Sequence, residues 1–156
     1  PNSKADFPMN LILNTIPEEA AFTTRPEVSD QIRYGEYLTT AASCVICHTP
    51  AKKGKLKMDL AFAGGREFKM PAGILRSQNI TPDPETGIGN WSREDFIKRF
   101  KAYSEENSLS SVGEEDYNTI MPWAMYADMT EDDLSAIYKY LHSLEPIKNE
   151  IVFWEK

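Results

Sequence analysis

The two cysteines of this chain, Cys44 and Cys47, are separated by two residues, and His48 follows the second one directly. A C-x-x-C-H run is the signature of covalent attachment of a c-type haem. Two thiols at this spacing reach two vinyl groups on one edge of a porphyrin, and the adjacent histidine ligates the iron from the proximal side. Because the chain has no other cysteine, the sequence predicts one haem, held by these three residues.

Three other uses of a closely spaced cysteine pair remain as alternatives. A thioredoxin-like redox pair belongs next to a strand–helix unit, whereas helix-prone residues flank this motif. A structural zinc site needs four ligands, and the only further histidine is His142, far downstream. A disulfide here would close a very short loop and stabilise little. The motif therefore favours haem attachment, with the redox pair as the nearest alternative.

Composition and charge limit the class of protein. The 156 residues are 41% hydrophobic and 26% charged, which is typical of a soluble globular domain. We expect one domain at 29–156, preceded by an extended wrap or linker at 1–28. No apolar run reaches the ~18 residues of a membrane span. The net charge of −7 argues against nucleic acid as a partner.

The haem motif also predicts where the protein works. Haem is attached to C-x-x-C-H after export, so we expect a periplasmic or otherwise exported protein whose leader or preceding segment has been removed. The proline-rich start leaves open a longer native chain with a membrane tether or a further haem domain. The apolar run 9–13 is expected to dock as an extended segment, because the prolines around it exclude a long helix.

A first helix is expected from an N-cap at Ser29 to Ala42, with a rough apolar stripe on one face. Gly35 in its interior costs about 1 kcal/mol relative to alanine. We therefore predict that the last helix crosses there at close range. The contact is expected near residues Ile137, Tyr138 or Leu141.

Two further helices carry clear start signals. Ser92, with Asp95 three residues later, predicts a helix that buries Phe96, Ile97 and Phe100. Thr130 followed by three acidic residues predicts the last helix, which Pro146 ends. Its buried face is expected to comprise Leu134, Ile137, Tyr138, Leu141 and Leu144. Between the haem motif and Ser92, glycines and prolines indicate a long ordered loop.

The second axial ligand of the iron decides the chemistry. An iron with two strong protein ligands moves electrons, whereas an open position binds small molecules or supports peroxidase-type chemistry. Met121 precedes Pro122 between two predicted helices, and proline suits a loop that presents a side chain. The alternatives are Met125, Met70 before Pro71, and His142, which is expected to face solvent.

The order of helix, C-x-x-C-H, long loop, helix, Met-Pro and helix resembles that of class I c-type cytochromes. The run 79–92 is similar to a loop in the cytochrome subunits of bacterial alcohol and gluconate dehydrogenases, and Met121-Pro122-Trp123 resembles their distal-ligand segment. The resemblance covers residues 29–145, whereas 1–28 and the acidic insert 105–118 match nothing as specific. It implies an all-α class I cytochrome c fold, in which three main helices and long ordered loops surround one covalently bound haem.

The resemblance also implies residue roles. The indole of Trp91 would bond a haem propionate, and Arg76 and Asn79 are candidates for the same propionates. Pro50 would pack on the proximal histidine, and its carbonyl, or a neighbouring one, would accept the His48 Nδ1–H and fix the ring. His48 and Met121 would be the axial ligands.

These assignments predict a mono-haem electron carrier or relay domain that is not an enzyme by itself. Its partners would be redox proteins, such as a dehydrogenase or a terminal oxidase, that dock briefly at an exposed haem edge between acidic loops. Two alternatives need an open distal site. One is a haem enzyme of the peroxidase or sulfur-compound oxidoreductase type, and the other is a sensor of small ligands.

Overall fold

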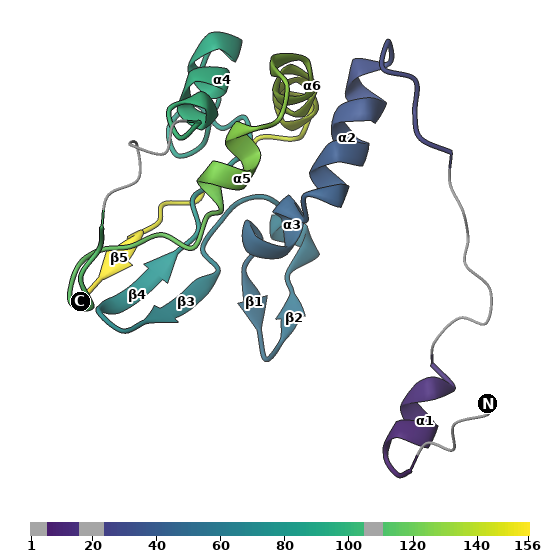
Figure 1. Ribbon diagram of the computed structural model, residues 1–156, viewed down its shortest axis with the longest axis vertical. Coiled ribbons are helices and arrows are strands. Elements are labelled where there is room, and N and C mark those ends of the chain that lie inside the picture. Colours follow the sequence, from purple (N-terminus) through teal and green to yellow (C-terminus); the bar gives the residue numbers. More distant parts are fainter. Residues whose placement is uncertain (1–5, 16–23, 105–110) are drawn as a thin grey trace.

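The structure is a computed structural model that describes residues 6–15, 24–104 and 111–156 (Figure 1). Its helices and strands follow in the order α1 (Met9–Leu13), α2 (Gln31–Ala41), α3 (Cys44–Cys47), β1 (Ala51–Lys52), β2 (Lys55–Leu56), the 3-10 helix η1 (Met58–Leu60), β3 (Glu67–Met70), β4 (Gly73–Arg76), α4 (Arg93–Lys101), α5 (Trp123–Ala127), α6 (Glu131–His142) and β5 (Trp154–Glu155). No helix among these described ranges is long and apolar enough to cross a membrane.

Helices α2 and α6 cross at very close range, and Gly35 lies at the crossing. A Cβ placed on Gly35 would overlap the carbonyl oxygen of Ala136 and would lie 2.8 Å from the Cβ of Tyr140. The predicted crossing of the first and last helices is therefore confirmed. The contact lies one residue from the predicted positions Ile137 and Leu141, because the backbone of Ala136 and the Cβ of Tyr140 face Gly35.

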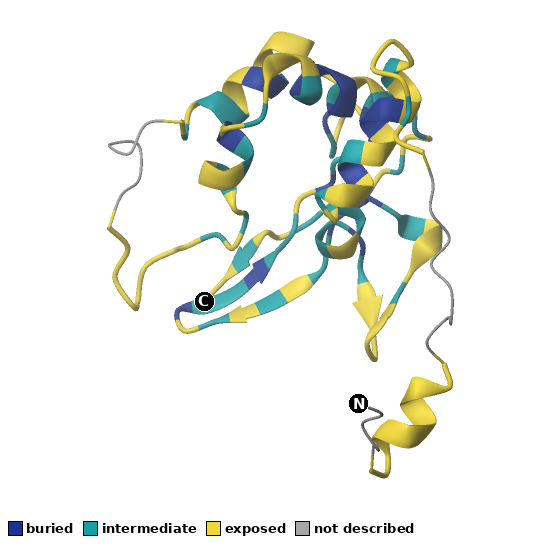
Figure 2. Cartoon of the chain, turned by 45° about the vertical axis from the view of Figure 1, so that its right-hand side comes forward, coloured by how far each residue is buried: buried dark blue, intermediate teal, exposed yellow. Residues whose placement is uncertain are grey.

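The core lies between α6, α4 and the segment that follows the cysteine motif. Its buried cluster comprises Phe62, Ile88, Phe96, Ile137 and Leu141, and Figure 2 shows buried stretches on the inner faces of the helices.

Helix α4 begins as predicted. The Ser92 hydroxyl accepts from the Asp95 amide, and the Asp95 carboxylate accepts from the Ser92 amide, so both ends of the capping box are formed.

The ends of the other two long helices differ slightly from expectation. The Thr130 hydroxyl caps α6 as predicted by accepting from the Asp133 amide. Helix α6 ends at His142, so Leu144 lies beyond it and only packs at the edge of the core. Asp30, not Ser29, caps α2, and its carboxylate accepts from the Arg33 amide. A carboxylate both fills the capping position and complements the helix dipole.

The expectation of an all-α fold was wrong in part, because the long loop after the motif contains strands. Strands β1 and β2 form a hairpin, and β3, β4 and β5 form a second antiparallel sheet in that order. The turns explain this. Lys53 and Gly54 have positive φ and reverse the first hairpin, and Gly73, with φ +155°, begins β4. Short extended segments can then pair across each turn.

One of the N-terminal expectations was wrong, namely that run 9–13 is a docked extended segment, whereas a linker role for residues 1–28 stays a prediction. The run 9–13 is the short helix α1, and its apolar side chains are exposed rather than docked. In Figure 1 it lies away from the other elements. Within the acidic insert 105–118, residues 105–110 lie outside the described ranges, and 111–118 contain only turns and irregular backbone.

Substitution of Gly35 by alanine tests the helix crossing. Alanine gains about 1 kcal/mol in helix propensity, but the overlap with the α6 backbone costs about 1–3 kcal/mol or more, and backbone cannot rotate away. We expect Gly35→Ala to lower the free energy of unfolding by about 2 kcal/mol, measured by denaturant titration of the haem-loaded protein.

The matched control is Thr40→Ala, at an exposed position of the same helix. It should change the free energy of unfolding by less than about 0.5 kcal/mol. Equal stability of the two variants would show that α2 and α6 can separate at Gly35 without cost.

Candidate haem-attachment site

The two cysteines lie on α3, a single helical turn set off from α2 by Ser43, whose φ is +58°. This left-handed residue ends α2 and redirects the chain. The His48 amide donates to the Cys44 carbonyl at 2.9 Å, so the motif is one closed turn. Both thiols are free and half-buried. The turn therefore presents two thiols and an imidazole as one compact group.

The chemistry of the thiols separates haem attachment from the redox alternative. Burial raises the pKa of Cys44 to about 11, so its thiol is protonated at neutral pH. Catalytic redox pairs depend on a cysteine whose pKa is lowered. Cys44 therefore lacks the lowered pKa of a catalytic redox cysteine, which favours haem attachment.

His48 has one ring nitrogen engaged by the backbone. Its Nδ1 lies 2.7 Å from the Gln78 carbonyl oxygen, so Nδ1 carries the proton and donates it. Burial lowers the pKa of His48, and the bond to Gln78 opposes this in part. The ring is therefore neutral at pH 7, and the Nε2 lone pair remains available to a metal. The predicted acceptor, the Pro50 carbonyl, accepts from the Lys57 amide instead, at 2.9 Å.

Gly64 brings the Gln78 carbonyl within reach of His48. With φ +74°, Gly64 has a backbone conformation that disfavours other residues, and a Cβ there would lie 2.5 Å from the Gln78 carbonyl carbon. The Gly64 amide donates to the His48 carbonyl at 2.7 Å. Sequence reasoning missed both Gly64 and Gln78. The Gly64-Gly65 pair was the available signal, because adjacent glycines often mark a close approach of two backbone segments. The sequence does not indicate which segment approaches Gly64.

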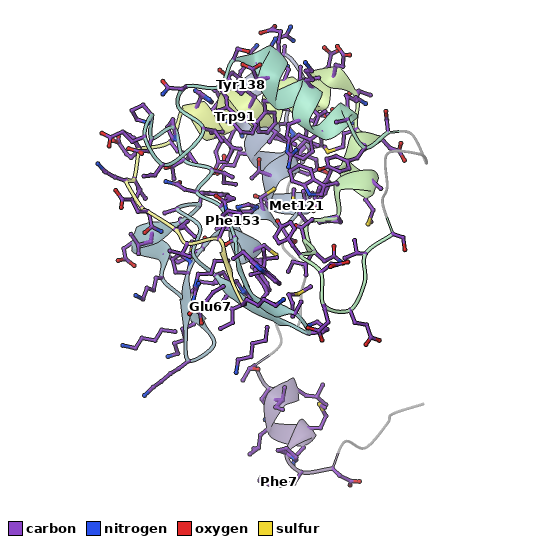
Figure 3. The ribbon with its side chains drawn as sticks, turned by 90° about the vertical axis from the view of Figure 1, so that its left-hand side faces the viewer. Phe7, Glu67, Trp91, Met121, Tyr138 and Phe153 are labelled. Carbon is purple, nitrogen blue, oxygen red and sulfur yellow. The ribbon has the colours of Figure 1, made fainter. Side chains whose placement is uncertain are left out.

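The structure brings the Met121 segment to the same end of α2 as the cysteine motif. Met121 is half-buried directly before α5. The Tyr126 hydroxyl on α5 donates to the Ala42 carbonyl at 2.9 Å, two residues before Cys44. Burial and the neighbouring cysteine thiols raise the pKa of Tyr126, so it stays a donor. Figure 1 shows α5 above α3, and Figure 3 labels Met121 in the interior.

Two of the residues predicted to bind propionates have protein partners in the structure. The Arg76 guanidinium forms ion pairs with Glu67 and Glu155 at 2.9 and 2.8 Å, and it also donates to the Val152 carbonyl. Asn79 is buried. Its amide donates to Thr86 and to the Ile147 carbonyl, and its oxygen accepts two bonds from Thr81. Both side chains thus fix the C-terminal segment, and their propionate role stays a prediction.

The remaining candidates lie in different surroundings. Trp91 is 37% exposed, and its carbonyl accepts from the Tyr138 hydroxyl (Figure 3). Its propionate role also stays a prediction.

The expectation that His142 faces solvent was wrong. Its ring lies against Tyr138 with centroids 4.1 Å apart, and its Nε2 is buried without a partner in the described part of the chain. Met125 is 74% exposed, and Met70 ends β3.

A sequence model of the cytochrome c family matches residues 32–145, which include the motif, Met121, helices α4 and α6, and all of α2 except its first residue. The chain belongs to the cytochrome c family. Members of this family carry covalently bound haem c and transfer electrons. The family region begins within α2 and ends before β5, so it contains the α2–α6 crossing and the whole attachment turn.

The relatives of this cytochrome c domain are much longer proteins. It is 38% identical to the cytochrome c subunit of a quinone-dependent alcohol dehydrogenase from Gluconobacter oxydans, over 74% of this chain and 22% of that protein. It is 36% identical to the gluconate 2-dehydrogenase cytochrome c subunit of Pantoea cypripedii, over 74% and 24%. It is also 33% identical to the fructose dehydrogenase cytochrome subunit of Gluconobacter japonicus, over 75% and 21%. The chain spans less than a quarter of these relatives.

The residues present fit the haem of the family. Cys44 and Cys47 are free thiols one helical turn apart, which suits two thioether bonds. His48 is neutral, and its Nδ1 is bonded to Gln78, which fixes the tautomer whose Nε2 ligates iron. The two thiols and the imidazole that would hold the haem are therefore present, and the Gln78 carbonyl orients the imidazole.

Substitution of Gly64 tests whether this close approach holds the site together. Gly64→Ala adds left-handed strain of about 1–2 kcal/mol and an overlap with the backbone of Gln78 and Asn79, worth about 1–3 kcal/mol. We expect the free energy of unfolding of the haem-loaded protein to fall by about 3 kcal/mol.

Gly54→Ala is the matched control, because Gly54 has φ +77° but a Cβ there meets nothing within 4 Å. It should lose only the strain of about 1–2 kcal/mol. If the two variants lose equal stability in denaturant titrations, the Gly64–Gln78 contact contributes nothing beyond the backbone conformation.

Proposed function

We propose that this domain is a mono-haem electron carrier in which His48 and Met121 are the axial ligands of one iron. The observation that carries this proposal is the His48 turn, where a bond to Gln78 leaves Nε2 free beside two free thiols. The chain has one such motif and no further cysteine, which supports a single haem. When bound, the haem supplies a one-electron iron couple.

Met121 is the proposed second ligand, and its place on the segment that Tyr126 joins to the end of α2 supports this. It is half-buried, and its amide donates to the Thr119 hydroxyl at 3.2 Å just before α5 begins. Met125 is mostly exposed on α5. A thioether sulfur favours the softer ferrous ion and raises the reduction potential. With both axial positions filled by this chain, the domain would move electrons without binding substrate at the iron.

The proposed partners are a dehydrogenase that donates electrons and a further redox protein, such as a terminal oxidase, that accepts them. Support comes from the names of the relatives, which include cytochrome c subunits of alcohol and gluconate dehydrogenases. We propose an exported, periplasmic location on chemical grounds, because haem is attached to this motif after export. The domain would then act as an electron-transfer part of an oxidoreductase rather than as an enzyme by itself.

Intact mass measured under denaturing conditions tests the attachment. The polypeptide should retain the mass of one haem, because thioether bonds survive unfolding. The Cys44→Ala, Cys47→Ala double variant should lose that mass, since it has no thiol left to form a thioether. A native chain with the bare polypeptide mass, or with two haems, would contradict the proposal.

Substitution of Met121 tests the axial ligand. Met121→Ala should abolish the weak near-infrared sulfur-to-iron band of the ferric protein, open the ferrous iron to CO and lower the reduction potential. The fold should survive, because the thioethers and His48 still hold the haem. The control Met125→Ala, at an exposed position of the next helix, should keep the band. Rapid CO binding by the native protein would favour the enzyme or sensor alternatives instead.

A further inference from the structure

Tyr117, in the stretch that leads to Met121, contacts two aromatic rings at the C-terminal end of the chain. Its ring centroid lies 5.2 Å from that of Trp154 and 6.0 Å from that of Phe153, and both interplanar angles are 87°. These are edge-to-face arrangements, in which the positive edge of one ring meets the negative face of another. In Figure 1 the segment before α5 runs alongside β5.

Of the two C-terminal rings, Trp154 lies in β5 and Phe153 directly precedes it, and both positions are tied to β4. Trp154 pairs with Leu75 in the sheet, and the Arg76 amide donates to the Phe153 carbonyl at 2.8 Å. The Arg76 side chain is anchored to the Glu155 carboxylate. A Cβ at Gly73 would lie only 3.1 Å from Trp154 Cζ2, so the indole lies close against the β4 backbone. Trp154 and Phe153 therefore form a fixed platform.

The residues after Met121 are anchored independently. The Trp123 ring on α5 stacks on Tyr103, with centroids 5.1 Å apart, and contacts Phe100. The Tyr126 hydroxyl bonds the Ala42 carbonyl. Before Met121, by contrast, the hydrogen bonds of the described residues 111–120 run only to nearby residues of the same stretch, whereas the Met121 carbonyl already accepts from the Trp123 amide on α5. The Tyr117 ring is the aromatic contact found between the described residues of this stretch and the C-terminal segment.

We propose that Tyr117 is a positioning residue for Met121, and that β5 holds it through Trp154 and Phe153. This rests on the proposed ligand role of Met121. Tyr117 and α5 are held on either side of Met121, so the short span that carries the methionine has restricted motion. Trp154 and Phe153 lie beyond residue 145, where the family match ends. The C-terminal segment therefore adds a restraint on the distal side that the matched region lacks.

Variants of the haem-loaded full chain test this role. Tyr117→Leu and Trp154→Leu remove the ring contacts, so residues 111–120 should exchange their amide hydrogens faster, as measured by mass spectrometry. The rate at which CO binds the ferrous protein should rise roughly tenfold, the change expected from losing aromatic pairs of this kind. The sulfur-to-iron band should also be lost at a lower pH than in the native protein.

Two further variants separate positioning from general damage. Tyr117→Phe keeps the ring edge and should behave like the native protein. Tyr37→Leu removes a half-exposed ring that stacks on Tyr34 on α2, and it should change neither exchange in 111–120 nor CO binding.

The outcomes separate the failure of this inference from the failure of the proposed function. Unchanged hydrogen exchange in both leucine variants, or faster exchange with unchanged CO binding, would overturn the positioning role while His/Met ligation stands. Rapid CO binding by the native protein, measured before any variant, would overturn the ligation and the positioning role with it.

Discussion

The contact of α2 with α6 at Gly35 is the constraint on which the other elements depend. Because no side chain separates the helices, the α6 backbone lies against α2, and Tyr34 can bond Asp133 across the crossing at 2.8 Å. Helix α6 also carries Ile137 and Leu141 into the core shared with α4. The crossing thus fixes the direction in which α2 delivers the cysteine turn.

The site itself is held by backbone rather than by side-chain recognition. A left-handed residue at Ser43 turns the chain into α3, and Gly64 allows the 77–79 backbone to approach closely enough for Gln78 to bond His48. A carbonyl is a suitable acceptor, because it fixes the ring orientation without adding a charge near the iron. The segment around Met121 is held instead by longer-range contacts, from Tyr126 to the end of α2 and from Tyr117 to β5.

The residues predicted from the motif and two of those predicted from the resemblance differ in what they touch. Cys44, Cys47 and His48 form the attachment turn and need no other residue to define them. Asn79 and Arg76 instead bond protein groups, and both bind the C-terminal segment, one through Ile147 and the other through Glu155. Through that segment they connect to the platform on which Tyr117 packs. Asn79 and Arg76 therefore hold the C-terminal segment against which the Tyr117 ring packs.

The sequence by itself determined the features that depend on local chemistry. The C-x-x-C-H spacing, the capping box at Ser92 and the cap at Thr130 were readable because each acts over a few neighbouring residues, and Gly35 was readable because a glycine inside a helix marks a close approach even where the partner is distant. The tertiary structure decided what depends on distant partners. It assigned Gln78 rather than Pro50 to His48, paired β5 with β4, and turned His142 inward against Tyr138. Such contacts join segments far apart in the chain, so only the packing of the whole domain selects them.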